Sequence, residues 1–390
     1  MKIKVGLFFG GNSVEHEISI ISALQAYQVI DKDKYDVVPI YLTKENEMYV
    51  GYEISNIENY KNINLLKSKS QRVTLVYDHG QVRLVKFPFK MLNRVYDYLD
   101  LALPIVHGSN VEDGTLVALF KMVNLPYVGS NVLASAIGMD KQLMKDVLKS
   151  YDLPVLDYVS FNRADYDQGV DYIVKESLKK FGYPLVVKPA NLGSSIGISK
   201  VNNQKDFIKA IDYAYEYTNK IIIERCVLKL REINCAVLGN YEGAIASECE
   251  EPILTDDILT FEDKYVNEGS KSKGMVSLKR ELPANITKEQ KKTIQDLALR
   301  TFNVLGCSGV ARVDFLLEGK KVYINEINTI PGSLSYYLWK ESGIEYAELL
   351  DRLINIALKE DKINKKIISS FDTNILENLS EKGLKSSGKK

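Results

Sequence analysis

Residues 311–329 read ARVDFLLEGKKVYINEINT, and this stretch decides how the C-terminal part of the chain folds. Two mostly apolar runs, 309–317 and 321–327, flank the turn Glu318-Gly-Lys320. Apolar, β-branched runs on either side of a short glycine turn predict a β-hairpin.

The hairpin carries polar side chains between its apolar residues. Side chains two apart on a strand share a face, so Arg312 lies on the side of Asp314, and Glu326 on the side of Asn328. A turn centred near Gly319 sets Arg312 near Glu326 and puts Asp314 one pair nearer the turn. Four polar groups are therefore expected to converge on one face.

This polar face offers the ligands of a hard cation. Two carboxylates, Asp314 and Glu326, and the amide oxygen of Asn328 repel one another unless a cation sits among them, and oxygen ligands of this kind suit Mg²⁺. The alternative is an ion pair from Arg312 to Glu326 with no metal. Asn328 has no place in that alternative.

A second group of residues suits a polyphosphate. Lys188 ends an apolar strand, and the glycine-serine loop 193–197 follows it closely. The lysine supplies a point charge, and the loop supplies free backbone N–H groups. The loop lacks the Gly-Lys-Ser/Thr of a Walker motif, and Gly10-Gly11 lacks the third glycine of a dinucleotide fingerprint. Both standard nucleotide folds are therefore disfavoured.

The N-terminal part predicts an α/β fold. Residues 2–9 form a buried strand, the glycine loop 10–13 follows, and 15–30 is an amphipathic helix. Further strands at 35–41 and 99–106 continue the alternation typical of a parallel sheet. The intervening polar segment 45–93 is predicted to be a peripheral insertion.

The rest of the chain predicts α+β organisation. Beyond the hairpin, we expect helices at 140–150, 288–305 and 346–358, and strands at 184–188, 221–224, 232–238 and 243–246. The charged segment 254–279 has no clear period and is expected to be a lid. The lysine-rich residues from 359 onward have the composition of a frayed tail.

Composition and charge exclude several classes of function. Among 390 residues, 51 Lys and Arg balance 51 Asp and Glu, so no net field attracts nucleic acid. The longest charge-free run, 122–139, contains too many glycine, proline and asparagine residues to span a membrane. The four cysteines form no C-x-x-C pair and are read as reduced, buried thiols: Cys226, Cys235, Cys249 and Cys307. We therefore expect a cytoplasmic protein with neither nucleic acid nor membrane as partner.

Seven short motifs occur in the chain in the same order as in a known protein family. They read GGNSVEHEIS (10–19), HGSNVEDG (107–114), MDK (139–141), KPANLGSSIG (188–197), EINCAVL (232–238), KY (264–265) and EINTIPG (326–332). Chance agreement of seven motifs in order is negligible. Over about residues 1–358 the chain resembles the D-alanine–D-alanine ligases of the ATP-grasp superfamily.

The resemblance implies a fold of three domains. An N-terminal substrate domain with a parallel sheet spans 1–137, and a central ATP-grasp domain spans 138–226. A C-terminal ATP-grasp domain, 227–358, holds the metal and acceptor sites, and 359–390 is a flexible tail. ATP lies between the last two domains in similar enzymes.

The resemblance also implies a reaction. ATP phosphorylates the carboxylate of one D-alanine, and the amino group of a second attacks the acyl phosphate, which gives a dipeptide for peptidoglycan precursors. Two Mg²⁺ ions, or Mn²⁺ in their place, assist. The partners are small amino acids. The oligomeric state is left open, with a homodimer as one alternative.

Individual roles follow from the matched motifs. The ions are held by Asp314, Glu326 and Asn328, and Arg312 stabilises the transferred phosphate and the oxyanion. Glu15 binds the first substrate's ammonium and is linked through Ser194 to Tyr265, and His107 lies near its carboxylate. The remaining residues bind ATP: Lys141, Lys188, Ser195 and Lys264 at its phosphates, and Glu224 and Glu232 at its adenine and ribose. The alternative for Glu224 and Glu232 is that they are solvated acids at strand ends with no role in binding. The alternative for His107 is that it is a capped loop residue.

The sequence departs from the family pattern where specificity is set. Val111 and Val117 replace a usual glycine and glutamine, and the segment 331–339 is shorter than usual. In that segment, Gly332 and a hydroxyl of Ser333 or Ser335 are the candidates to receive the second substrate's carboxylate.

Three functions are weighed. The first is D-alanyl-D-alanine synthesis, and the second is the same chemistry with a different amino or hydroxy acid as acceptor. The third, a nucleotide-binding regulator without catalysis, is disfavoured because the arginine, the three metal ligands and both lysines all persist.

Overall fold

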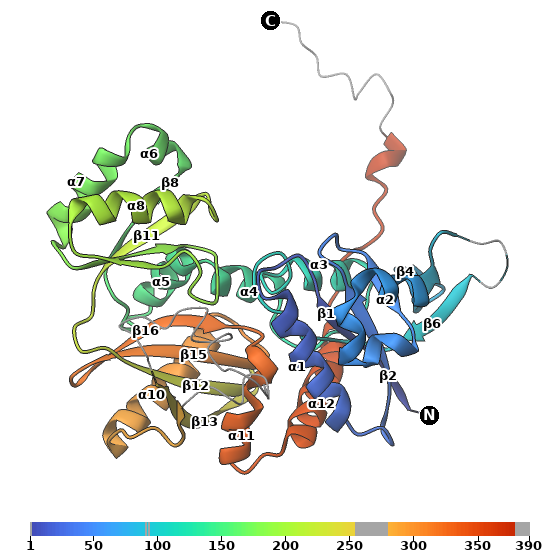
Figure 1. Cartoon of the computed structure of the whole chain (residues 1–390). Helices are drawn as coiled ribbons and strands as arrows, with labels where there is room; N and C mark the ends of the chain where they lie inside the picture. The colour runs from blue at the N-terminus through green and yellow to red at the C-terminus, as the bar shows by residue number, and fades with distance from the viewer. Residues whose placement is uncertain (1, 90–91, 93, 254–279, 379–390) are drawn as a thin grey trace, which may run out of the picture.

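The structure is a computed structural model that describes residues 2–89, 92, 94–253 and 280–378. The predicted lid 254–279, with Lys264 and Tyr265, lies outside the described residues. The described residues form three β-sheets (Figure 1), with strand orders β6-β5-β4-β3-β2-β1-β7, β10-β9-β11-β8 and β14-β13-β12-β15-β16. The predicted mixed α/β class is confirmed.

The first sheet contains the predicted parallel strands. β1 (Ile3–Gly10) pairs in parallel with β2 (Tyr35–Leu42) and with β7 (Leu101–Pro104), and α1 (His16–Val29) follows β1. The glycine loop between β1 and α1 puts Glu15 directly before the helix.

The segment 45–93 is peripheral as predicted, because its strands lie toward one edge of this sheet. Its strands β3 (Met48–Val50), β4 (Gln71–Asp78) and β5 (Gln81–Lys86) extend the same sheet, followed by β6 (Val95–Leu99). One face of β4 and β5 is apolar, because Val73, Leu75, Val82 and Leu84 are all buried. The short elements of the segment are η1 (Tyr52–Ser55), η2 (Ile57–Lys61) and α2 (Ile63–Lys69).

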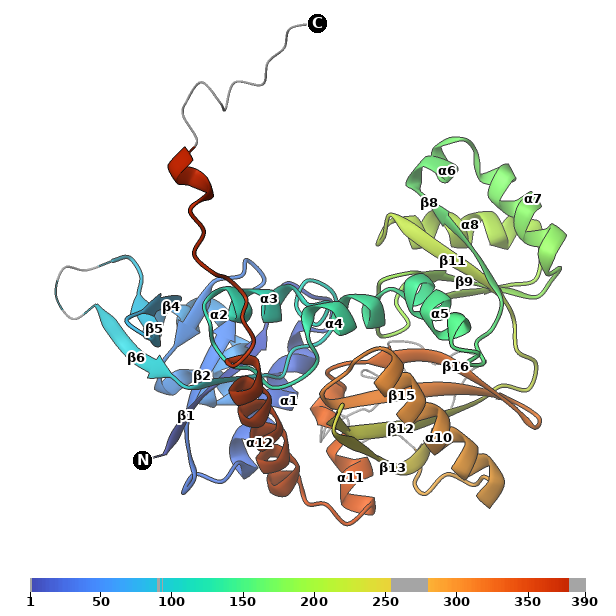
Figure 2. The ribbon, with the colours of Figure 1, turned by 180° about the vertical axis from the view of Figure 1, so that it is seen from behind.

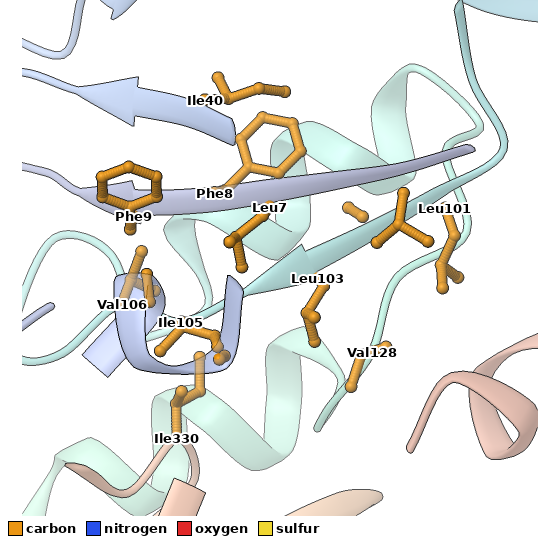
Figure 3. Packing of buried hydrophobic residues seen from close by; sticks show 14 of the residues in the cluster. Leu7, Phe8, Phe9, Ile40, Leu101, Leu103, Ile105, Val106, Val128 and Ile330 are labelled. Carbon is orange, nitrogen blue, oxygen red and sulfur yellow. The ribbon is translucent and has the colours of Figure 1, made fainter. Parts of the chain in front are cut away.

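The largest core joins the two ends of the chain. Leu7, Phe8 and Leu103 pack with Ile105, and Ile330 from the C-terminal part enters the same cluster (Figure 3). The helices α11 (Tyr336–Glu341) and α12 (Tyr346–Asn364) belong to this cluster too, and α12 lies beside α1 (Figures 1 and 2). α12 runs past its predicted end at residue 358. Burying each large apolar side chain stabilises the fold by roughly 1.5–3 kcal/mol, so the C-terminal segment is firmly attached to the N-terminal sheet.

The second sheet is antiparallel and has a helix-covered face. Its strands are β8 (Tyr158–Asn162), β9 (Leu185–Pro189), β10 (Ser199–Val201) and β11 (Lys220–Arg225). The helices around it are α5 (Lys141–Ser150), α6 (Arg163–Asp167), α7 (Val170–Lys180) and α8 (Gln204–Tyr215). Ile221 and Ile223 of β11 pack under α7 and α8, so Glu224 points to the opposite face.

The third sheet has one apolar and one polar face. Its strands are β12 (Arg231–Asn240), β13 (Gly243–Pro252), β14 (Arg280–Glu281), β15 (Gly309–Glu318) and β16 (Lys321–Asn328). The long helix α10 (Lys288–Val304) covers the apolar face, where Ile233, Val313 and Phe315 are fully buried. Residues between these positions point to the other face, so β15 and β16 present their polar side chains away from α10.

The predicted hairpin is present, but the predicted pairing of Arg312 with Glu326 was wrong. Arg312 lies opposite Asn328, and Asp314 lies opposite Glu326, because the register shifts between Asp314 and Phe315. The extra residue at this bulge is Asn325. Pairing near the turn follows the predicted register, and the bulge displaces only the end that carries the polar residues.

Two short helices had no assignment from the sequence: α3 (Thr115–Met122) ends where the charge-free run 122–139 begins, and α4 (Val132–Met139) forms the last part of that run. None of the helices formed by the described residues has the length and apolar character needed to cross a membrane. All four cysteines are free thiols as predicted, and three of them are buried, whereas Cys226 is partly exposed.

Candidate functional site

The polar face of the third sheet centres on Asp314. Arg312 donates to both oxygens of Asp314, from Nε to Oδ1 at 2.6 Å and from Nη2 to Oδ2 at 2.7 Å. Asn328 Nδ2 donates to Oδ2 at 3.1 Å. Burial opposes the charge on Arg312, but the adjacent carboxylate raises its pKa above the ordinary value. The arginine therefore forms its ion pair with Asp314 rather than with Glu326.

Glu326 instead contacts a lysine from α5. Its Oε2 lies 3.1 Å from Lys141 Nζ, which also donates to the Leu192 carbonyl at 2.8 Å. Lys141 thus connects the hairpin to the segment that leads into the glycine-serine loop. This proximity agrees with their predicted roles, because Lys141 is expected to contact the ATP phosphates and Glu326 to hold the metal ions beside them.

A buried charge bridge links α5 to Lys188. The Glu224 carboxylate lies 2.8 Å from Lys145 Nζ and 2.6 Å from Lys188 Nζ, and it is almost fully buried. Burial alone would raise the pKa of Glu224, but the two ammonium groups lower it to about 2. The structure therefore places Glu224, a predicted adenine or ribose ligand, between two cations. Lys145 was missed by the sequence reasoning, although it follows Lys141 by one helical turn.

The glycine-serine loop approaches the start of α1. Ser194 Oγ donates to Glu15 Oε1, so the predicted link between these residues is present. Ser194 and Ser195 adopt left-handed φ values of 55° and 59°. Glycine is favoured at position 108, because its φ is +82° and a Cβ atom there would lie 2.3 Å from Ser13 Oγ and 2.8 Å from Glu15 Oε2. Loop, helix start and the Gly108 turn therefore surround one carboxylate.

His107 is buried and bonded on both ring nitrogens. Nδ1 lies 2.9 Å from the Ile330 carbonyl, and Nε2 lies 3.0 Å from Ser22 Oγ. A carbonyl only accepts, so Nδ1 carries the proton and Nε2 accepts from the serine. Burial lowers the pKa of His107 to about 4. The ring is therefore neutral at physiological pH.

We expect the His107 ring to stay neutral when the pH is lowered from neutral to about 5. Its carbon-bound proton resonances in NMR spectra should not move in this range. Because the unfolded chain takes up this proton near the ordinary pKa of 6.5, the neutral ring also costs stability below that pH. A midpoint near 6.5 in the folded protein would contradict the assignment.

Glu112 is a buried acid that the sequence reasoning quoted within a motif but did not assign. It accepts from the backbone N–H of Gly108 at 3.0 Å and of Ile330 at 2.9 Å. Burial, with a smaller effect of Glu15, raises its pKa to about 8. Glu112 ties the His107 loop to the strand end after β16.

The predicted acceptor turn is η4 (Gly332–Ser335). Ser333, Leu334 and Ser335 have left-handed φ values of 48°, 54° and 52°. The Ser333 N–H donates to Ser22 Oγ at 3.0 Å, and its hydroxyl donates to Gln25 Oε1 at 2.7 Å. The Ser333 hydroxyl is therefore directed toward α1, while Ser335 is fully buried.

One cavity brings most of these residues together. Of the predicted residues that the structure describes, its walls include Glu15, His107, Ser194, Glu232, Arg312, Glu326, Asn328 and Gly332. Lys141 lines a smaller neighbouring cavity with Glu15 and Glu326. Asp314, Lys188, Ser195, Glu224, Ser333 and Ser335 are not among the lining residues. The walls also contain residues with no predicted role: Ile18, Glu112, Asn234, Glu250, Pro252, Arg280, Ile330 and Tyr337.

Known proteins resemble the chain over nearly its whole length. Family models described as D-ala D-ala ligase N-terminus and C-terminus match residues 4–130 and 147–355. The D-alanine–D-alanine ligase of Thermosipho melanesiensis is 39% identical over 374 residues, which covers 96% of this chain and 98% of the relative. The solved D-alanine-D-alanine ligase of Coxiella burnetii has a TM-score of 0.77 at 30% identity, covering 94% and 98%. VanG D-Ala:D-Ser ligase from Enterococcus faecalis has a TM-score of 0.76 at 29% identity, covering 92% and 100%.

Proposed function

The chain belongs to the D-alanine–D-alanine ligase family, and from this premise we propose that it joins two molecules of D-alanine in an ATP-dependent reaction. It is a carboxylate–amine ligase, and its product serves peptidoglycan precursor synthesis. The observation that carries the proposal is the shared cavity in which Glu15, Ser194 and Arg312 meet from separate parts of the chain.

The reaction has two steps. A carboxylate oxygen of the first D-alanine attacks the γ-phosphorus of ATP, the bond to the β-phosphate oxygen breaks, and ADP leaves. The amino group of the second D-alanine then attacks the carbonyl carbon of the acyl phosphate. The tetrahedral intermediate expels inorganic phosphate, and the nitrogen loses a proton. Such chemistry needs charge neutralisation, alignment and exclusion of water.

The residues around Glu15 suit the first substrate. Its carboxylate is positioned by Ser194 and by the start of α1, and it would hold the substrate ammonium. Neutral His107 contributes an uncharged wall beside the site. Arg312, held by the two hydrogen bonds that it donates to Asp314, is oriented to stabilise the oxyanion and the transferred phosphate.

The lysines suit the nucleotide. We assign Lys141 and Lys188 to the α- and β-phosphates and Ser195 to the loop that covers them. Glu232, which lines the cavity, is proposed for the ribose or adenine. If Glu224 binds the adenine, it must do so while it keeps its ion pairs with Lys145 and Lys188. Lys264 at the γ-phosphate and Tyr265 as the lid contact stay predictions.

The donor set also fits Mg²⁺. Asp314 lies opposite Glu326 across the strands, and Asn328 lies on the same face. In the structure each carboxylate is balanced by a protein cation, Asp314 by Arg312 and Glu326 by Lys141. These three side chains would hold two Mg²⁺ ions, or Mn²⁺ with the same ligand preference. When bound, the ions neutralise charge on the transferred phosphate.

The other functions are less well supported. The curated relatives carry the name D-alanine–D-alanine ligase at 36–39% identity, so a different acceptor is not favoured. We place the reaction in the cytoplasm, where ATP is available and where four free thiols stay reduced. A homodimer stays a prediction.

The test is an assay of purified protein with ATP, Mg²⁺ and single amino acids. We expect phosphate release with D-alanine and a product with the mass of D-alanyl-D-alanine, and no release with L-alanine. D-Serine and D-lactate are supplied beside D-alanine as competing acceptors. A mixed product in excess of the D-alanine dipeptide, or phosphate release without any dipeptide, would contradict the proposed reaction.

A further inference from the structure

The second D-alanine brings its carboxylate into a closed site, and this negative charge needs a hydrogen-bond donor there. A buried carboxylate without a partner is strongly disfavoured. The two serines expected to bind it are engaged or buried elsewhere: Ser333 bonds Ser22 and Gln25 of α1, and Ser335 is fully buried outside the cavity lining. Gly332 is the residue of this turn that lines the cavity.

The cavity wall contains a second arginine, Arg280, at the start of β14. Its side chain is 12% exposed, and its guanidinium lies 4.0 Å from the centre of the Tyr337 ring. Arg280 Nη1 donates to Glu250 Oε2 at 3.0 Å. A guanidinium has five N–H donors in a plane, so it can serve a protein carboxylate and a ligand carboxylate together.

Glu250 holds this arginine in place. Its Oε1 accepts from Tyr337 OH at 2.8 Å and from Asn234 Nδ2 at 3.1 Å, while Oε2 accepts from Arg280. Glu250 and Asn234 are both buried. The guanidinium is thus fixed by a carboxylate on one side and by an aromatic face on another, as a preorganised binding group requires.

The position relative to Arg312 suits an acceptor. Arg280, Tyr337 and Gly332 line the same cavity as Arg312. Tyr337 and Glu250 are close enough to Arg312 to contribute to its raised pKa. In D-alanine the amino group and the carboxylate are attached to one carbon. A donor that binds the carboxylate must therefore lie within the length of one small molecule from the reacting carbonyl.

We propose that Arg280 receives the carboxylate of the second substrate, with Gly332 and Tyr337 forming the walls of this acceptor subsite. The inference rests on the proposed ligase function and names a specificity-determining residue for it. It replaces the serine hydroxyls of the 332–335 turn as the charge-recognising group. The turn then acts by shape, because the Ser333 N–H and hydroxyl are committed to α1 and Ser335 does not line the cavity.

The experiment compares two acceptors in one reaction. D-Alaninamide keeps the amino group of D-alanine and replaces the carboxylate with a neutral amide. Protein is incubated with ATP, Mg²⁺ and a mixture of D-alanine and D-alaninamide, and the ratio of dipeptide to dipeptide amide is measured by mass spectrometry. This ratio reports acceptor choice alone, because both products share the same donor, nucleotide and enzyme concentration.

We expect wild-type protein to favour the dipeptide and Arg280→Met to shift the ratio toward the amide by about 100-fold. Arg280→Lys keeps the charge but loses the planar fork, so it should give an intermediate ratio. The matched control is Arg231→Met. Arg231 forms a similar pair with Glu251, at 2.7 Å from Nε to Oε1, but it does not line the cavity.

The outcomes separate the two proposals. If wild-type protein makes no dipeptide from D-alanine, the proposed function fails before acceptor choice is tested. If it makes dipeptide and the ratio is unchanged in both Arg280 variants, Arg280 is not the carboxylate ligand, whatever happens to the overall rate. A shift of similar size in Arg231→Met would show that loss of any arginine on this sheet alters the ratio, and would also overturn the assignment.

Discussion

Replacing Glu326 with glutamine should lower the rate of dipeptide formation by roughly 10³-fold, or about 4 kcal/mol in transition-state stabilisation. Glutamine keeps the size of the side chain and its hydrogen-bonding capacity. It removes the negative charge that faces Lys141 at 3.1 Å and that we assign to Mg²⁺. The loss should therefore fall on charge neutralisation during phosphoryl transfer and not on folding.

The measurement is the turnover number at saturating ATP and D-alanine, followed by titration with Mg²⁺. The variant should need more Mg²⁺ for half-maximal rate, and its thermal unfolding should match that of wild type. Glu318→Gln is the control, since Glu318 lies at the turn end of the same hairpin and pairs with Arg225. Near-normal turnover with an unchanged Mg²⁺ requirement would rule out the metal assignment.

Replacing Lys145 with methionine should reduce the free energy of unfolding by roughly 3–5 kcal/mol. The variant leaves the buried Glu224 carboxylate with one cation in place of two, while methionine fills a similar volume. Lys149→Met on the same helix is the control. Lys149 pairs with Asp157 in a largely exposed ion pair, whose loss should cost less than about 1 kcal/mol.

Urea unfolding at two pH values gives a second measure. The pKa of Glu224 is about 2 in the folded protein, against an ordinary value of 4.5, so its ionised form stabilises the fold fully above about pH 4.5. That contribution is lost as the pH falls toward 2. With Lys145 removed, the pKa should rise and acid unfolding should begin at a higher pH. Equal stability of Lys145→Met and Lys149→Met would show that the bridge is not a stabilising element.

The hairpin illustrates what the sequence could and could not predict. Its two runs and its turn are local features, so both strands and the shared polar face follow from alternation and from glycine. The bulge at Asn325 has no local signal in the sequence. The alternation of apolar and polar residues does not show whether a strand contains an extra residue, or which of the two strands contains it. As a result the residues on the face were predicted correctly, while the partners of Arg312 and Glu326 were not.

Lys145, Glu112 and Arg280 show a second limit. Each is an ordinary charged residue in the sequence, and its importance depends on groups far away in the chain. Lys145 of α5 meets Glu224 of β11, and Glu112 meets the backbone of Ile330. Periodicity reports which residues face inward, but it does not say which two buried charges meet.

The segment 45–93 was correctly predicted to be peripheral, but its pairing with the first sheet was not predicted. Its short strands are polar on one face and are separated by turns, which is also the pattern of a surface excursion. Their buried face becomes evident only when β3 pairs with β2 and the strands join the sheet.

The turn at 333–335 makes two distant parts of the chain inseparable. Three consecutive left-handed residues, each unfavourable by roughly 1 kcal/mol, are retained because Ser22 and Gln25 of α1 bond to Ser333. Segment exchange between homologues would therefore have to move this turn and the middle of α1 as one cassette. Recombination that separates them would leave a strained turn without its hydrogen bonds to α1. Substitutions in this turn and in α1 must therefore be compatible with each other.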